Sequence, residues 1–526
     1  MLAQVQSAAL LGCDAEPVTV EVDASRGLPQ WSLVGLAAVA VRESRERVAA
    51  ALANAGYTVP PRRITVSLSP GDLRKDGTAF DLPIALATLA AVGVLDPQRL
   101  DGLVCLGELG LDGSVRAVRG CLAVARAMAA RGNGARLVVP AGNADEAALV
   151  LSDRVVAAEA LRTIVEAIRS ASLTPWQRTT ALDAMHARAT ECCSDIVGQP
   201  LSVRALEIAA AGAHSLALVG PPGAGKTMLA RRLAGILPPL DDASALEVLT
   251  IQSIAGQLTS GLRRPARPFR APHHTASAAA LVGGGSPPRP GEVTLAHLGV
   301  LFLDEFSLFS RPALDALREP LEDGTVQIAR AHGVVRFPSR AQVVIASNPC
   351  PCGYWGEPGH RCRCRGADLL RHAMRLSGPL FDRVDLHVRV GRVPLDALSS
   401  GQRGETSAQI AERVRCARDR QRARAAQGIG AAPINSALSP SALEHPAIIS
   451  AVAWRSAARA AEHLRLSARG FHRLLRVART IGDLADREIV GVEEVGEALR
   501  YRPAIDGAPD AADRPPSPIR SFVPDG

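Results

Sequence analysis

A glycine-rich segment, GPPGAGKT at 220–227, has the residue types and spacing of a phosphate-binding loop. A short apolar run precedes it and a segment with helical spacing follows, which is the strand–loop–helix context such a loop requires. Gly223 and Gly225 would let the backbone turn its N–H groups toward phosphate oxygens. Lys226 would contact the β- and γ-phosphates of ATP, and the Thr227 hydroxyl would hold Mg²⁺. The expected ATP-binding residues are Gly220, Pro221, Pro222, Gly223, Ala224, Gly225, Lys226 and Thr227.

Two further apolar runs have the pattern of buried strands, and each of them ends in polar side chains. The first run, GVLFLDE at 299–305, ends in a pair of carboxylates. Asp304 would order the water shell of Mg²⁺, and Glu305 would act as the general base that polarises the attacking water. The second run, QVVIASN, ends in Asn348, which could orient that water. For Asn348 an ordinary turn residue before Pro349 is an equally good interpretation.

Four cysteines form a C-x-C-x9-C-x-C pattern after the second of these strands. They are Cys350, Cys352, Cys362 and Cys364. Four thiolates on one loop can bind a tetrahedral Zn²⁺, and His360 is a possible substitute ligand. Because C-x-C is tighter than the more usual C-x2-C spacing, four reduced thiols remain the alternative. A zinc ion here would be structural.

Composition limits the classes of function. The chain has 526 residues with a net charge of +8 and a pI near 9.2, which favours a polyanionic partner. Its only lysines are Lys75 and Lys226, so the presence of one of them in a phosphate-binding motif supports a functional role for it. No apolar run approaches the roughly 20 residues that span a bilayer, and the N-terminus lacks a basic region before its apolar residues. We therefore expect a cytoplasmic protein without a membrane segment.

The order of apolar, polar and arginine-rich stretches predicts five consecutive parts. Residues 1–168 alternate strand and helix patterns and indicate an α+β domain. A polar linker at 169–193 leads to the α/β domain at 194–400 that carries the phosphate-binding loop. Residues 401–505 read as helical, and the proline-rich 506–526 as a disordered tail.

Nearly the whole chain resembles the AAA+ ATPases of the Mg chelatase-like group, and most of all the ComM/YifB family. The most specific segments are SLSPGDLRKDGTAFDLPIALA, RPFRAPHHTAS, ASNPCPCGYWG, LSGPLFDRVDL and LSARGFHRLLRVARTIGDL. The resemblance implies an AAA+ core with a helical lid, in which Asn348 is sensor 1 and Arg383 the arginine finger. It gives Arg469 as sensor 2, with Arg473 the second choice. A finger that acts on a neighbouring subunit implies a ring, and the family suggests a homo-hexamer.

The first 168 residues resemble the Lon protease-like domain, a relative of the ribosomal S5 domain 2 fold. In those proteases a serine pairs with a lysine. Here Ala79 stands at the serine position and Leu122 near the lysine position. Since a dyad needs both an activated hydroxyl and an amine, we expect this domain to be non-catalytic.

Three cationic segments could contact a nucleic-acid backbone, where phosphate contacts dominate affinity. They are the stretch 262–274, a candidate hairpin at 323–337 with Arg330 and Arg336 near its turn, and the segment 401–480, which has 14 Arg against 5 Asp and Glu and includes the arginine run 413–424. For the last of these, a solvated helix face is the preferred interpretation.

These features lead to a hexameric ATP-dependent DNA translocase, for which the family suggests branch migration of DNA joint molecules, as in natural transformation or recombination. The alternative is a chelatase- or chaperone-type motor that remodels a protein partner. An ATP-dependent protease is nearly excluded, because the dyad is missing.

Overall fold

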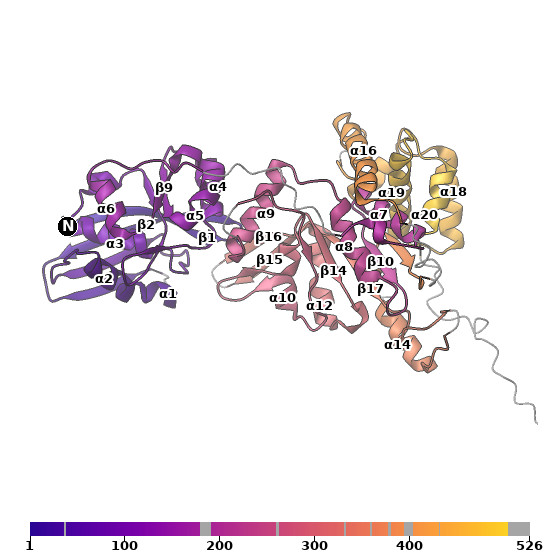
Figure 1. The fold of residues 1–526 in the computed structure, drawn as a ribbon, viewed down its shortest axis with the longest axis horizontal. Coiled ribbons are helices and arrows are strands. Elements are labelled where there is room, and N and C mark those ends of the chain that lie inside the picture. Colours follow the sequence, from indigo (N-terminus) through magenta and orange to yellow (C-terminus); the bar gives the residue numbers. More distant parts are fainter. Residues whose placement is uncertain are drawn as a thin grey trace, which may run out of the picture.

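The fold is known from a computed structural model, in which three parts follow one another along the long axis of the molecule (Figure 1). The described residues are 1–35, 38–178, 191–258, 262–330, 333–357, 360–376, 380–393, 403–430 and 432–502. Residues 179–190 of the expected linker, the expected boundary between core and lid, and the expected C-terminal tail therefore lie outside the described residues.

The N-terminal part is built on a seven-stranded mixed sheet with the order β3-β4-β2-β1-β5-β8-β9. Its strands are β1 (Leu2–Leu11), β2 (Asp14–Ser25), β3 (Gln30–Val34), β4 (Arg63–Ser69), β5 (Leu103–Cys105), β8 (Arg136–Pro140) and β9 (Val155–Ala158). A small hairpin adds β6 (Glu108–Leu109) and β7 (Val115–Arg116). The helices are α1 (Val39–Arg42), α2 (Ser44–Asn54), α3 (Asp81–Ala91), α4 (Cys121–Arg131), α5 (Ala141–Leu151) and α6 (Leu161–Arg169), with short 3-10 turns at Pro97–Leu100 and Ser152–Arg154.

Successive side chains of a strand point to opposite faces of a sheet. Both faces are buried at β5 and β8, whereas buried and more exposed residues alternate along β2 and β4. In β8, Val138 packs with α2, α3 and α6, whereas Leu137 and Val139 pack with α4 and α5. Helix α3 is buried along its whole length, which explains its nearly continuous apolar sequence.

The central part is a parallel five-stranded sheet with the order β11-β14-β17-β10-β18. Its strands are β10 (Leu216–Val219), β11 (Phe269–Arg270), β14 (Val300–Leu303), β17 (Gln342–Ser347) and β18 (Leu386–Arg389). The helices around it are α7 (Pro200–Gly212), α8 (Lys226–Ile236), α9 (Asp242–Ala255), α10 (Ala278–Val282), α11 (Glu292–Leu295), α12 (Arg311–Ala316), α13 (Arg318–Asp323) and α14 (Gly366–Leu376), with 3-10 turns at Cys193–Asp195, Phe306–Leu308 and Phe381–Arg383. Two hairpins, β12 (Gly283–Gly284) with β13 (Arg289–Pro290) and β15 (Thr325–Arg330) with β16 (Gly333–Pro338), complete it.

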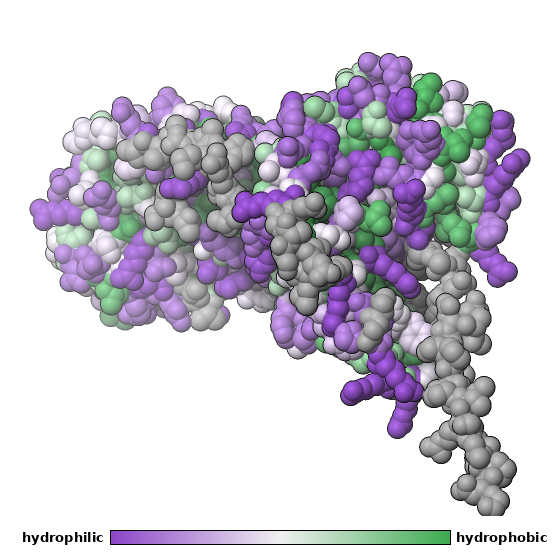
Figure 2. All heavy atoms as spheres, turned by 45° about the vertical axis from the view of Figure 1, so that its right-hand side comes forward, coloured by the Kyte–Doolittle hydropathy of each residue, from purple (hydrophilic) through white to green (hydrophobic). Residues whose placement is uncertain are grey.

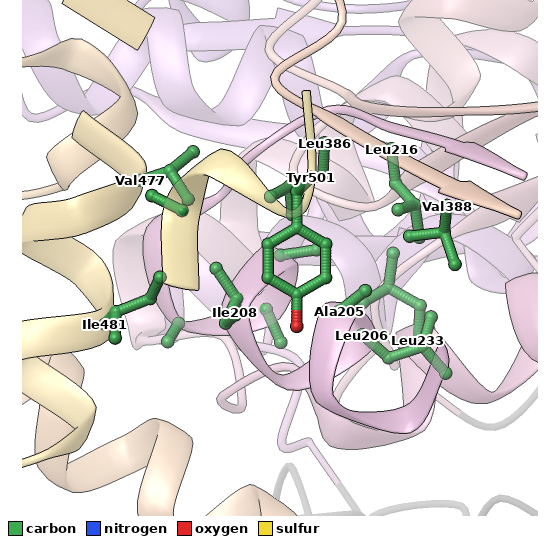
Figure 3. Close-up of a cluster of buried hydrophobic side chains, with 14 of the residues drawn as sticks. Ala205, Leu206, Ile208, Leu216, Leu233, Leu386, Val388, Val477, Ile481 and Tyr501 are labelled. Atoms are coloured by element: carbon green, nitrogen blue, oxygen red, sulfur yellow. The ribbon is translucent and has the colours of Figure 1, made fainter. Parts of the chain in front are cut away.

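The C-terminal part is helical and shares one core with the central sheet. Its helices are α16 (Ser407–Ala426), α17 (Pro440–Leu443), α18 (Ala451–His463), α19 (Ala468–Leu484) and α20 (Val492–Leu499), with a 3-10 turn at Asn435–Ala437. Thr406, Ser439, Ser450 and Ser467 each cap the start of a helix through the side-chain oxygen. Figure 3 shows Val477, Ile481 and Tyr501 of this part beside Ile208 of α7 and the sheet residue Leu386.

The N-terminal part contacts the central part through α4 and the tip of the β1–β2 hairpin. Arg126 of α4 donates to the Thr250 hydroxyl on α9 at 3.1 Å, and the Gly120 N–H donates to the Ser253 carbonyl at 3.2 Å. At the hairpin tip, a Cβ added to Gly12 would lie 2.5 Å from the carbonyl oxygen of Arg336 in β16. The turn therefore touches the strand with backbone alone.

In the described part of the chain, no helix is both long and apolar enough to cross a membrane. On the face drawn in Figure 2, hydrophilic side chains are spread over all parts of the described surface, with apolar ones between them.

Candidate active site

The glycine-rich loop lies between the carboxyl end of β10 and the start of α8, as its sequence context predicts. Gly223 (φ 77°) and Gly225 (φ 86°) adopt left-handed backbone conformations that L side chains rarely take. Gly220 needs its missing side chain for another reason, since a Cβ there would lie 2.1 Å from the Val390 carbonyl oxygen. With the first N–H groups of α8 pointing into it, this loop has the form of an anion site.

The Lys226 ammonium is directed at the loop and at the neighbouring strand. It donates to the carbonyl oxygens of Gly220 (2.6 Å) and Pro221 (2.9 Å) and to Oδ1 of Asn348 (3.0 Å). Burial lowers the pKa of Lys226, and the Asp304 charge partly opposes this shift. Phosphate oxygens placed in the loop would be the natural partners of these donors.

Thr227 and Asp304 meet at 2.9 Å, Oγ1 to Oδ2. Asp304 stands at the end of β14, and its second oxygen accepts from the Glu305 N–H at 2.8 Å. A hydroxyl and a carboxylate side by side are oxygen donors of the kind that Mg²⁺ prefers beside nucleotide phosphates. The two residues therefore fit the expected magnesium role.

The general-base candidate Glu305 has a left-handed backbone conformation (φ 50°), and its side chain is about half exposed. Its Oε2 lies 3.1 Å from Nδ1 of His274, which follows β11 in the RAPHH segment. Sequence reasoning missed His274, since nothing in the spacing connects residues 31 positions apart. The only signal in the sequence was the pair of histidines, His273 and His274, in the basic stretch 262–274.

Gln199 is a second residue that sequence reasoning missed. Its amide nitrogen donates to the carbonyls of Ala224 (2.9 Å) and Gly391 (3.2 Å), so it ties the loop to the segment after β18. Gln199 precedes α7, and Pro200 at the first helical position marks that start in the sequence.

Arg383 lies at the opposite edge of the sheet from the loop. It lies three residues before Leu386, the first residue of β18, and its carbonyl accepts from the hydroxyl of Ser215, which precedes β10. Its guanidinium pairs with Glu322 of α13. Because β10 spans four residues, about 13 Å, the Arg383 side chain starts one strand length away from its own phosphate loop.

The two sensor 2 candidates lie at the same edge as Arg383. Arg473 of α19 approaches Asp385 at 3.6 Å, and Arg469 is exposed in the first turn of that helix. Burial lowers the pKa of Arg473, and the charges of Arg476, Arg383 and Arg469 add to this shift, while Asp385 opposes it. The structure thus brings these arginines together with the finger candidate and away from Lys226.

The candidate hairpin at 323–337 forms a β-hairpin with Thr325–Arg330 paired to Gly333–Pro338. Val326, Ile328, Val335 and Phe337 are buried against the central part, and Arg336 is exposed. Arg330 ends β15, but its side chain lies outside the described residues.

The other two cationic segments are occupied by contacts within the chain. In 262–274, Arg264 pairs with Asp242, Arg270 pairs with Glu292, and Arg267 donates to the carbonyls of Pro238 and Leu298. Each arginine of the run 413–424 also has a partner in the same chain; these are Arg413, Arg415, Arg418, Arg420, Arg422 and Arg424. Arg336 on the hairpin is exposed, as is Arg263 in the first of these stretches, and both stay candidates for contacts with an external polyanion.

The four cysteines lie together between β17 and α14. All four Sγ atoms are within 4.8 Å of one another, and the Sγ distances are 3.4 Å for Cys350–Cys352, 3.8 Å for Cys350–Cys362 and 3.5 Å for Cys352–Cys362. Zn–S bonds of about 2.3 Å give a tetrahedron with edges of about 3.8 Å, so the donor set fits Zn²⁺. His360 instead contacts Arg392 and the Tyr354 ring.

The cysteine loop also supports the phosphate-binding loop. A Cβ added to Gly353 would lie 2.5 Å from Cδ of Pro222. His372 of α14 contacts the Asn348 carbonyl at 2.8 Å through Nε2. Folding of the cysteine loop is therefore linked to the positions of Pro222 and Asn348.

In the N-terminal part, no serine–lysine pair stands at the positions expected for a protease. Leu122 is buried in α4, and the carbonyl of Ala79 accepts from the Gly107 N–H at 2.9 Å. The ammonium of buried Lys75 turns to the Pro70 carbonyl, and the Thr78 hydroxyl donates to Glu108.

Comparison with known proteins places the whole chain in one family. Residues 192–398 match "Magnesium chelatase, subunit ChlI", 20–143 match "Subunit ChlI of Mg-chelatase", and 404–502 match "Magnesium chelatase, subunit ChlI C-terminal". The chain is 41% identical to an uncharacterized protein named YifB of Salmonella typhimurium, over 96% of this chain and 97% of that protein. It is 41% identical to the competence protein ComM of Haemophilus influenzae, over 96% and 98% of the two chains. Its identity to the uncharacterized protein Rv2897c of Mycobacterium tuberculosis is 44%, over 95% and 98%.

This protein therefore belongs to the Mg chelatase-like AAA+ family that includes YifB and ComM.

Lys226→Ala and Glu305→Gln should separate binding from hydrolysis. The first variant loses the ammonium for the phosphates and should not bind a fluorescent ATP analogue. The second keeps the loop intact, so it should bind ATP normally while turnover falls by about 10²–10⁴-fold, the usual contribution of a general base. Normal turnover in either variant would contradict the assignment.

Metal analysis of the purified protein should find about one Zn²⁺ per chain. The Cys350→Ser/Cys352→Ser variant should lose it and bind ATP more weakly, because the cysteine loop packs against Pro222. Cys416→Ser, which changes a cysteine in α16, is the control and should retain zinc. Wild-type protein that is folded, active and free of zinc would contradict the zinc prediction.

Proposed function

We propose that this protein is a hexameric, ATP-driven DNA translocase that moves branch points in DNA joint molecules. The observation that carries the proposal is the division of the ATPase residues between two opposite edges of the parallel sheet. Lys226, Thr227 and Asp304 stand at the carboxyl edge, and Arg383 stands at the amino edge. One chain cannot complete this site, but a neighbour in a ring can.

Within one subunit, the proposed roles follow from the contacts. The loop N–H groups and Lys226 would bind the phosphates of ATP, and Thr227 and Asp304 would hold Mg²⁺, which neutralises charge on the transferred phosphoryl group. Glu305 would take the proton of the attacking water. Asn348, already within 3.0 Å of Lys226 Nζ, would fix the position of that water.

The neighbouring subunit would supply a further positive charge to this ATP site. Arg383 would stabilise charge on the phosphoryl oxygens across the boundary, as arginine fingers do. Arg469 and Arg473 lie at the same edge, which favours the same neighbouring site for sensor 2. Of the two, exposed Arg469 is the better candidate, because Arg473 is engaged by Asp385.

DNA is the substrate that the relatives and the charge favour. One relative is named a competence protein, and competence concerns uptake of DNA. The net charge of +8 and the exposed Arg336 on the hairpin supply sequence-independent contacts to phosphates. A motor that remodels a protein partner, as the Mg chelatase relationship suggests, is the second candidate.

The trans role of Arg383 can be tested by mixing inactive subunits. Arg383→Ala should bind ATP and hydrolyse it poorly, and Glu305→Gln should do the same. Mixed rings contain interfaces with an intact Glu305 on one side and an intact Arg383 on the other, so part of the activity should return. Rings that form from the mixture and stay inactive would contradict the trans role.

DNA movement can be tested with synthetic four-way and three-stranded junctions. Junctions should be resolved faster with ATP than with a non-hydrolysable analogue. Arg330→Ala and Arg336→Ala should each weaken DNA binding and lower the dependence of binding on salt by about one phosphate contact, while basal ATPase stays nearly unchanged. Arg162→Ala, an exposed residue of α6, is the control.

If the protein hydrolyses ATP, forms rings and leaves every forked or four-way substrate unchanged, the DNA proposal fails. Protein remodelling would then be the better hypothesis.

A further inference from the structure

We infer that the cysteine loop between β17 and α14 binds a single strand of DNA, with phosphates on Arg361, Arg363 and Arg365 and a base on Trp355. The inference rests on the proposed DNA substrate and adds a second contact to it, separate from the hairpin β15–β16. It begins with the charge of this region, since residues 350–376 contain five arginines and two acidic residues.

The cysteines direct the three arginines outward. The four Sγ atoms lie within 4.8 Å of one another, so the loop folds around its thiols. From 361 to 365 the exposure alternates, with each arginine exposed and Cys362 and Cys364 half-buried between them. Three guanidinium groups are thus carried into solvent by one short segment, an arrangement that suits the repeated phosphates of a nucleic-acid backbone.

Among the described residues, none of these three guanidinium groups has an ion-pair or hydrogen-bond partner. Asp368, the acidic residue that follows them, is paired with Arg371 at 2.9 Å. The arginines of 413–424, in contrast, each contact a partner within the chain. A zinc ion with four thiolates would carry a negative net charge, but in the described loop no guanidinium group of the three contacts a thiol sulfur. The three arginines are therefore available to an external anion.

Trp355 gives the same loop an aromatic ring. The other three tryptophans, Trp31, Trp176 and Trp454, pack against hydrophobic cores. Trp355 is half-buried and belongs to none of the cores that the described residues form. The ring of its neighbour Tyr354 is already covered, by His360 at 4.9 Å and by the Arg392 guanidinium at 5.3 Å. A tryptophan outside the cores, next to unpaired arginines, points to a ligand that has both a π-face and phosphates.

These two features together favour a single strand over a duplex. Bases stack on one another inside a duplex, whereas an unpaired base can stack on an aromatic side chain. Trp355 stands three residues after Cys352, and the arginines stand beside Cys362 and Cys364, so the sulfur cluster brings the ring and the charges to one loop. Unpaired bases are exposed where a strand leaves one duplex for another, which is the structure that a branch-point motor acts on.

The loop lies beside the ATP site and apart from the hairpin. Figure 1 shows α14 projecting from the central part below β17, with β15 and β16 nearer to the N-terminal part. The loop packs on Pro222 through Gly353. Contact with a neighbouring subunit is the competing use of this region, because Leu370 and Met374, one turn apart on α14, are 54% and 57% exposed. Both lie outside the cysteine loop, so strand binding and ring assembly can be measured separately.

Fluorescence anisotropy of a labelled single-stranded oligonucleotide with the full-length chain tests the inference. Arg361→Ala/Arg363→Ala/Arg365→Ala should raise Kd at least about tenfold and reduce the slope of log K against log salt by about 2, since each single-strand phosphate contact contributes about 0.7. The corresponding triple lysine variant should keep the slope, because its charges remain. Trp355→Ala should raise Kd about tenfold with an unchanged slope, because stacking releases no counterions, and should not affect a blunt duplex. Trp355→Phe keeps a ring and should bind nearly as wild type.

Arg45→Ala/Arg162→Ala/Arg169→Ala removes three exposed arginines of the N-terminal part and is the control for net charge. Wild-type Kd and salt slope in the triple alanine variant of the loop, with wild-type thermal unfolding, overturn the inference and leave the hairpin as the DNA contact. Loss of ring assembly in that variant identifies the loop as a subunit contact and also overturns it. If wild-type protein binds no single strand the inference fails, and if it also binds no junction the DNA proposal fails with it. If the loop variants lose binding while wild-type protein moves no junction with ATP, the inference stands and the translocase proposal fails.

Discussion

The arrangement of this molecule depends on the parallel pairing of β14, β17 and β10. The register sets Leu303 beside Ile345 and Val219 beside Ser347, so the three strands end at one edge. The residues that follow each strand must then meet, although the bonded pairs are 77 and 122 positions apart in the sequence. Hydrogen bonds from Lys226 to Asn348 and from Thr227 to Asp304 are the direct result. β18 also pairs in parallel with β10. At the amino ends of these two strands, Arg383, Ser215 and Asp385 therefore lie together.

Buried polar contacts hold the helices of the C-terminal part together, and one of them, through Thr480, reaches the residues before the central sheet. The carboxylate of buried Asp483 accepts from Arg424, Arg479 and Asn435, so two buried guanidinium groups have a charged partner. Thr480, next along α19, contacts the buried ring of His214 at 2.7 Å, and His214 directly precedes the strand start at Ser215. Arg469 and Arg473, on the same helix, therefore keep their places relative to the core.

Features confined to one continuous segment were predictable from the sequence. The loop at 220–227, the two acidic residues after β14, the cysteine pattern and the hairpin each have a local signature, because turn chemistry and strand periodicity act over a few residues. The structure forms these elements where the sequence placed them. Their roles in catalysis and binding stay predictions.

Contacts between segments far apart in the sequence could not be predicted. The charge count predicted that 262–274 and 413–424 are surfaces for a polyanion. A net charge, however, does not indicate which acidic side chains lie next to the arginines in the folded protein. Arg413 reaches Glu207 across more than 200 residues, and Arg270 meets Glu292. The contacts of His274 and Gln199 are of the same kind, since each depends on which strand lies beside which.

In the N-terminal part, the residues at the positions expected for a serine–lysine dyad take part in packing. Leu122 is fully buried in α4, and Ala79 packs against the adjoining core cluster. The N-terminal part is in close contact with β16, because the turn at Gly12 lies against the Arg336 carbonyl with no room for a side chain. The hairpin formed by β15 and β16 is itself packed into the central core through Phe337. Any displacement of β16, the strand that carries Arg336, would therefore have to be accommodated by the N-terminal turn at Gly12.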